Sequence, residues 1–281
     1  MMIKVAVAEV SVPFLVFARS AVGAAVLCPV ALRGRGFAAL KGHWNAVAIF
    51  ALIEMIVPWG LLAHGQTRLS SSTAALIVAA TPILTVLIGK LVGGAERLGR
   101  ARWMGLVLGF AGVGVLTAPE SHGQLGSIAA IVIAAACYAG GSIVAARWLK
   151  NVPATAMTVA CLAIAAGVYL LPALVTWPQS LPSISVIAAI GALGAVCTAL
   201  AFACFFLLIR EVGAERAVVI TYVAPAVAVA SGVTLLSEPL DARIVVSFGL
   251  ILCGTYLATR RRSGTRSLRG RNALRQHRRP E

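Results

Sequence analysis

The chain of 281 residues is 60% hydrophobic and only 12% charged, with a mean hydropathy of +0.94. A soluble domain carries roughly 25% charged residues, because polar groups must cover its core, so this composition excludes an ordinary soluble fold and predicts a membrane protein. The net charge of +15 does not indicate a nucleic-acid partner, because nine of the 24 basic residues lie in the last 22 positions and most others lie between apolar segments.

Apolar segments follow one another along the chain, most of them near the roughly 20 residues that cross a bilayer as a helix. They cover approximately residues 12–32, 45–64, 72–93, 103–118, 125–147, 155–176, 184–208, 216–236 and 243–259. We therefore expect an all-α integral membrane protein, a polytopic bundle of about nine transmembrane helices. The six cysteines and four histidines are scattered without metal-ligand spacing, so we expect no metal site and no cofactor.

Basic residues alternate between the connections and so predict the orientation. The gaps after the first, third, fifth and seventh segments, together with the C-terminal segment, hold 19 lysines and arginines, whereas the alternate gaps and the N-terminal residues hold three. This asymmetry predicts a multi-pass protein of the inner cell membrane with a cytoplasmic C-terminus and with residue 1 outside. Residues 261–281 are predicted to form a disordered basic tail that binds anionic lipid headgroups.

The sequence repeats itself at an offset of about 142 residues. Thr81-Pro82-Ile83 matches Ala224-Pro225-Ala226, and Glu96-Arg97-Leu98 matches Glu238-Pro239-Leu240. Five predicted spans separate the matched elements, and an odd number gives two copies that point in opposite directions across the membrane. We expect a first repeat over residues 1–122 and a second over residues 123–260.

Aligning the repeats leaves the helix at 125–147 without a full counterpart before residue 12. We therefore interpret the chain as a five-plus-five design that lacks its first helix. Two explanations are open: the start codon is placed too far downstream, or the chain is a truncated paralogue.

Short motifs lie along nearly the whole chain, and some of them recur in the same order in its second half. They are Phe17-Ala18-Arg19-Ser20, Ala80-Thr81-Pro82-Ile83-Leu84-Thr85, Gly94-Ala95-Glu96-Arg97-Leu98, Trp103-Met104-Gly105, Gly109-Phe110-Ala111-Gly112-Val113, Tyr222-Val223-Ala224-Pro225 and Ser237-Glu238-Pro239-Leu240. Together they resemble the drug/metabolite transporter superfamily, in its EamA-like ten-helix family. The resemblance implies ten helices, cytoplasmic termini, and export or exchange of amino acids, other metabolites or drugs. The chain departs from the family by lacking the first helix.

Arg19 and Glu54 are the only ionisable residues well inside the predicted spans. A charge in the bilayer is costly, so such residues usually face the bundle interior and have a partner or a function. Glu54 is predicted either to face a cavity, as a proton carrier or a cation contact, or to pack against a polar neighbour. Arg19 is predicted either to belong to the substrate or ion pathway or to extend to the outer interface.

Two mid-helix prolines and three aromatic residues complete the predicted pathway. Pro82 and Pro225 each remove a backbone hydrogen bond, so they are candidates for hinges or for cavity-lining positions, the alternative being a static kink. Trp59, Tyr138 and Tyr222 are candidate aromatic contacts for substrate or cation. Glu96 and Glu238 are expected to cap the helices that follow them or to hold loops.

These features predict a secondary transporter that moves a small organic solute by alternating access, with an ion gradient or the solute's own gradient as the driving force. No catalytic residues are expected, so the chain is not predicted to be an enzyme. The alternatives are a truncated, non-transporting membrane partner protein and, less favoured, a membrane-embedded enzyme. Coupling to protons and assembly as a homodimer are further hypotheses.

Overall fold

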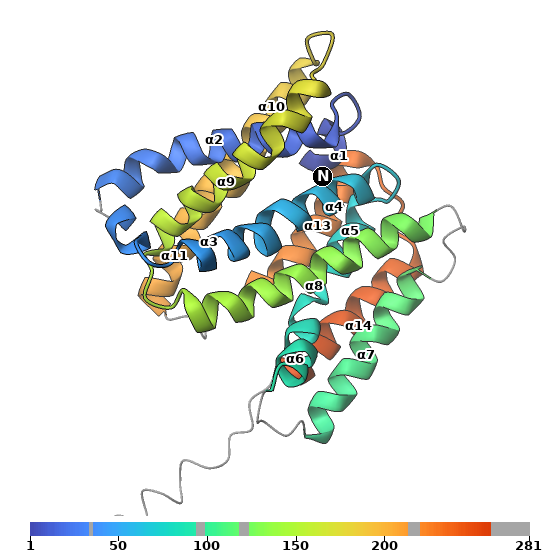
Figure 1. The fold of residues 1–281 in the computed structure, drawn as a ribbon. Coiled ribbons are helices and arrows are strands. Elements are labelled where there is room, and N and C mark those ends of the chain that lie inside the picture. The colour runs from blue at the N-terminus through green and yellow to red at the C-terminus, as the bar shows by residue number, and fades with distance from the viewer. Residues whose placement is uncertain (34–35, 94–98, 118–123, 213–219, 260–281) are drawn as a thin grey trace, which may run out of the picture.

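The computed structural model describes residues 1–33, 36–93, 99–117, 124–212 and 220–259. Throughout these ranges the secondary structure is helical and contains no strand. In chain order the elements are α1 (Met2–Ala6), α2 (Val12–Arg33), the 3-10 turn η1 (Gly36–Leu40), α3 (Trp44–Ala51), η2 (Leu52–Ile56), α4 (Val57–Gln66), α5 (Ser71–Ala79), α6 (Thr81–Leu91), α7 (Arg100–Thr117), α8 (Leu125–Trp148), α9 (Ala154–Val175), α10 (Ile184–Gly194), η4 (Ala195–Leu200), α11 (Ala201–Val212), α13 (Ile220–Leu236) and α14 (Ala242–Thr259) (Figure 1).

Seven helical segments among the described residues are long and apolar enough to cross a membrane. They are Val12–Arg33, Trp44–Gln66, Ser71–Leu91, Leu125–Trp148, Ala154–Val175, Ile184–Phe205 and Ala242–Thr259. The two other predicted spans coincide with α7, whose first turn carries two arginines, and with α13, which contributes a shorter apolar helix over Val223–Leu236. The predicted all-α, polytopic membrane bundle is confirmed.

The second span changes its winding halfway across. Helices α3 and α4 are joined by η2, a π-helical segment, and Pro58 follows it in the first turn of α4. Proline has no N–H to donate, so the carbonyl of Glu54, four residues earlier, loses its usual helical partner. Such π segments interrupt the regular ladder and occur often at functional sites.

The same interruption occurs in the second half of the chain. Helices α10 and α11 are joined by the π-helical η4, where the hydroxyl of Thr198 donates a hydrogen bond to the carbonyl of Leu193, five residues back, at 2.7 Å. Ala195, the first residue of η4, follows Leu52, the first residue of η2, by 143 residues. This offset equals the distance from Pro82 to Pro225, so both repeats carry the same break at the same place.

Helices related by the repeat pack against each other in opposite directions. At the start of α2, the Ser11 hydroxyl lies 2.8 Å from the Thr176 hydroxyl at the end of α9. Beyond the end of α2, a Cβ added to Gly36 would lie 2.8 Å from the Cβ of Ala156, near the start of α9. Figure 1 shows the two helices running side by side. Antiparallel packing of equivalent helices is the arrangement that an inverted repeat produces.

Helices α7 and α14 form the second such pair and approach closely. A Cβ on Gly254 would lie 2.5 Å from the backbone nitrogen of Gly109 and 2.7 Å from the carbonyl oxygen of Gly105. A Cβ on Gly112 would lie 2.9 Å from the side chain of Ile251. In lipid, such small residues allow backbones to meet and so supply the packing that holds helices together.

Candidate functional site

A cavity of about 700 Å³ lies within the helical bundle and draws its walls from both halves of the chain. Its lining residues are Glu54 from η2, Ala75, Val78 and Ala79 from α5, Thr81, Pro82, Thr85 and Val86 from α6, Tyr138 and Ser142 from α8, Ile220, Ala224, Pro225 and Ala228 from α13, and Thr259 from α14. The volume falls in the range of small-molecule sites, which are mostly apolar with a few polar groups that orient the ligand.

Both repeat prolines lie in the cavity wall. Pro82 stands at the junction of α5 and α6 and leaves the carbonyl of Val78 without its helical N–H donor. The hydroxyl of Thr81 takes over and donates to that carbonyl at 2.6 Å. Pro225 lies within α13, which continues from Ile220 to Leu236. Both prolines thus line the cavity, and their role in transport, as a hinge or as a contact for solute, stays a prediction.

Glu54 is the acidic residue of the cavity wall. Its carboxylate packs against the backbone of Gly141, where any side chain would overlap it. The carboxylate oxygen Oε2 is buried and has no hydrogen-bond partner among the described residues. Of the two predictions for Glu54, the geometry therefore favours a group that faces the cavity.

Arg19 makes its described contacts inside the helical bundle. Its guanidinium carbon lies 3.6 Å from the centre of the Trp59 ring, and Nη2 donates to the hydroxyl of Thr198 at 3.2 Å. The Nε atom is buried without a hydrogen-bond partner in the described part of the chain. An aromatic face and a hydroxyl dipole both stabilise a desolvated cation.

Tyr138 connects the two ionisable residues. It lines the cavity together with Glu54 and lies close enough to both Arg19 and Glu54 to interact with them electrostatically. The two π segments position this group, because η2 carries Glu54 and η4 carries Thr198. Four residues predicted from the sequence thus form one polar cluster that reaches from the cavity wall into the bundle.

Some predicted residues lie outside this description. The side chain of Tyr222, the turn containing Glu96 and the tail at 261–281 fall outside the described residues. Sequence reasoning also missed the hydroxyl groups of the site. Ser142 follows Tyr138 by one helical turn, so the helical period could have placed it on the same wall. Thr198 offered no such signal, because it meets Arg19 across 179 residues.

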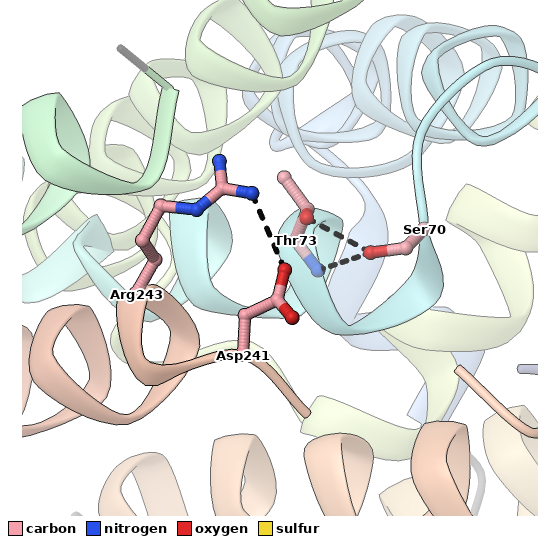
Figure 2. A network of polar contacts seen from close by, with 4 residues as sticks. All are labelled: Ser70, Thr73, Asp241 and Arg243. Carbon is pink, nitrogen blue, oxygen red and sulfur yellow. Dashed lines mark hydrogen bonds and ion pairs between the residues drawn. The ribbon is translucent and has the colours of Figure 1, made fainter. Parts of the chain in front are cut away.

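Glu238 caps a helix, but not the following one. Its carboxylate accepts hydrogen bonds from the first turn of α5: Oε1 from the backbone N–H and hydroxyl of Ser71, both at 2.7 Å, and Oε2 from those of Ser72, at 3.0 and 2.6 Å. Of the two predicted roles, capping of the following helix α14 is not observed, whereas the carboxylate holds its loop against the first turn of α5. Asp241 instead precedes α14 and pairs with Arg243, while Ser70 and Thr73 complete the cap of α5 (Figure 2).

The four hydrogen bonds make the Glu238 carboxylate insensitive to mild acid. Burial raises the pKa of this carboxyl, but the hydrogen bonds outweigh burial and hold the pKa at about 2, below the ordinary value of 4.5. Its contribution to stability is therefore complete above the ordinary pKa and is lost only as the pH falls through about 2.

We expect the difference in unfolding temperature between wild type and Glu238→Gln to be the same at about pH 5 and about pH 8. Thermal unfolding of both proteins in detergent at the two pH values measures this difference. A difference that shrinks at the lower pH would contradict the hydrogen-bonded carboxylate.

Comparison with known proteins agrees with this architecture. The sequence pattern of the EamA-like transporter family matches residues 1–118 and 125–260. The chain is 30% identical to the "Uncharacterized inner membrane transporter YedA" of Escherichia coli K12 over 244 residues, which cover 85% of this chain and 78% of that protein. It is 28% identical to the "Probable terminal-alkyne amino-acid exporter" of Streptantibioticus cattleyicolor, over 73% of this chain and 70% of the exporter.

A further relative and a solved structure extend the comparison. An "Uncharacterized transporter" of Archaeoglobus fulgidus is 30% identical over 70% of this chain and 71% of its own length. A protein of known crystal structure has the same fold, with a TM-score of 0.68 over 92% of this chain and 90% of that one, at 24% identity. With the family pattern matched along nearly its whole length, this multi-pass membrane protein belongs to the EamA-like transporter family.

Proposed function

We propose that the protein is a secondary transporter that carries a small organic solute through the cavity by alternating access. The observation that carries this proposal is the cavity itself, which both repeats build and whose wall includes Glu54, with a buried carboxylate oxygen that has no hydrogen-bond partner among the described residues. Two inverted repeats around a central site can move relative to each other and expose that site to each side of the membrane in turn.

The chemistry of the wall indicates what the solute contacts. Most of the lining is apolar, and the polar groups are the Glu54 carboxylate, Tyr138, Ser142 and threonine hydroxyls. Such a wall suits an amphipathic solute whose polar or cationic group reaches Glu54. Glu54 is then either the contact for that group or the residue that carries a coupled proton.

The charge asymmetry and the relatives support a proposal for the location of the protein and for the direction of transport. We propose residence in the inner cell membrane with a cytoplasmic C-terminus, because the basic connections lie on one side. A relative named as a probable amino-acid exporter favours export or exchange of small metabolites, so amino acids are the first solutes to test.

Filling the cavity is expected to stop transport. Ala228 lines the cavity on α13, whereas its neighbour Val227 is 58% exposed on the outer surface of the bundle. Ala228→Trp should lower solute counterflow in proteoliposomes at least about tenfold, because an indole would occupy the space of the solute. Val227→Trp is the matched control and should leave counterflow near the wild-type rate, since Val227 is not among the residues that line the cavity.

The same assay tests the proposed function as a whole. Wild-type proteoliposomes, preloaded with each member of a panel of amino acids and other metabolites, should accumulate at least one labelled solute. Equal counterflow in the two tryptophan variants would show that solute does not pass through this cavity. No counterflow of any member of a broad panel would count against the transport proposal.

A further inference from the structure

The contact between Glu238 and α5 joins the two repeats at one end of the bundle. Glu238 lies in the connection between α13 and α14, which belong to the second repeat, whereas Ser71 and Ser72 open α5 in the first. We call these three residues the Glu238 latch. Glu238 is 8% exposed, and its carboxylate accepts four hydrogen bonds, all from α5.

The backbone around the latch is shaped to present the carboxylate. Ser237 has a φ of 52°, in the left-handed region that residues other than glycine seldom adopt. The turn brings the N–H of Glu238 back to the carbonyl of Gly232, at 3.1 Å. A Cβ on Gly232 would lie 2.5 Å from both the Glu238 carboxylate and the Ser72 hydroxyl, so only glycine leaves room. A strained residue beside a tightly packed contact is common in parts that switch.

The latch lies just beyond one end of the cavity. Ala75 lines the cavity one helical turn after Ser71, and Ala228 lines it on α13, about one turn before Gly232. The lining continues away from the latch to Ile220, which lies 16 residues before Leu236, or about 24 Å along a helix. The latch thus closes α5 against the α13–α14 connection at one end of the cavity only.

We propose that the Glu238 latch is a gate between the repeats, and that its four hydrogen bonds must break for the cavity to open at that end. The proposal rests on the alternating-access function proposed above. Opening separates α5 from the α13–α14 connection, and water then replaces the hydroxyl and N–H donors around the carboxylate. Because these bonds join elements of different repeats, they stabilise one conformation of the cavity selectively, as a two-state gate requires.

The latch can be tested by measuring access to the cavity from each side without any substrate. A single cysteine at Ala75 is introduced into the full chain after its six cysteines are replaced, and a membrane-impermeant thiol reagent is applied to spheroplasts and to inside-out vesicles. In the otherwise unaltered reporter, we expect labelling from one side only. Glu238→Gln should raise labelling from the opposite side at least about tenfold, because an amide nitrogen cannot accept the bonds of Ser72.

Two further variants keep the result interpretable. The double variant Ser71→Ala, Ser72→Ala removes the two hydroxyl hydrogen bonds to Glu238 and keeps the two backbone ones. It should raise labelling from the same side as Glu238→Gln does, but to a smaller extent. Asp241 lies in the same connection, and its carboxylate pairs with Arg243 at the exposed surface. Asp241→Asn should therefore leave labelling of the Ala75 cysteine the same as in the unaltered reporter.

Unchanged labelling on both sides in Glu238→Gln and in the serine variant would overturn the gate. Labelling that rises equally in Asp241→Asn would also overturn it, because the effect would then belong to the loop. If the Glu238→Gln protein is labelled from neither side, the serine variant is decisive: labelling from the newly opened side supports the gate, and its absence overturns it. Because no solute is added, failure of the gate is distinguishable from failure of transport.

Discussion

Replacing Glu54 by Gln is expected to lower solute transport at least about tenfold and to abolish its pH dependence. Glu54 lines the cavity, and its buried Oε2 atom has no hydrogen-bond partner among the described residues, so we expect the carboxylate to interact with a solute cation or a proton. An amide of the same shape preserves the packing against Gly141 but carries neither charge nor exchangeable acid. The loss of one charge-assisted contact corresponds to about a tenfold change or more.

Counterflow in proteoliposomes over a range of pH measures both effects. Glu9→Gln is a suitable control, because Glu9 lies outside the cavity, where it accepts hydrogen bonds from the backbone and hydroxyl of Ser183. A Glu54→Gln protein that keeps both the wild-type rate and the wild-type pH profile would show that Glu54 is neither the proton carrier nor the cation contact.

Gly254→Leu is expected to prevent stable packing of α7 on α14. The first atom of any side chain at this position would lie 2.5 Å from the backbone nitrogen of Gly109 and 2.7 Å from the carbonyl oxygen of Gly105. Backbone cannot rotate away as a side chain can, so the helices must separate. The cost is about 3 kcal/mol, at the upper end of the range for overpacked cores.

Gly249→Leu is the matched control on the same helix. A Cβ there meets no atom within 4 Å, so this substitution should leave the unfolding temperature in detergent unchanged or slightly raised. Size-exclusion profiles and thermal unfolding of the two variants make the comparison. Equal stability of the two proteins would mean that the α7–α14 contact does not hold the bundle together.

The positions of the π segments show why a repeat in the sequence is informative. Pro82 and Pro225 revealed an offset of 143 residues, and the breaks at η2 and η4 obey the same offset. The π segments themselves were not predicted, because a single inserted residue in a helix leaves no compositional trace. Pro58 accounts for the first break, whereas no proline lies within η4 or directly after it.

The residues of the candidate site were predicted from the sequence, but the contacts between them were not. Glu54 and Arg19 were identified because ionisable residues are rare within apolar spans, and Tyr138 and Trp59 because aromatic residues suit cations and amphipathic solutes. Which of them meet was not predictable. A helix that is apolar on most of its surface gives no stripe that fixes its rotation, so the sequence does not say which side faces its neighbours.

The sequence by itself determined that this protein lies in a lipid bilayer, that it is built of helices and that it consists of two repeats. Lipid offers no hydrogen bonds to the backbone, so the spanning segments must be apolar helices of nearly fixed length, and that requirement is legible in composition. The tertiary structure alone decided the contacts between distant parts, including Arg19 with Thr198 and Glu238 with Ser71. These contacts depend on how whole helices rotate and approach, which is set by packing across the bundle and not by any local pattern.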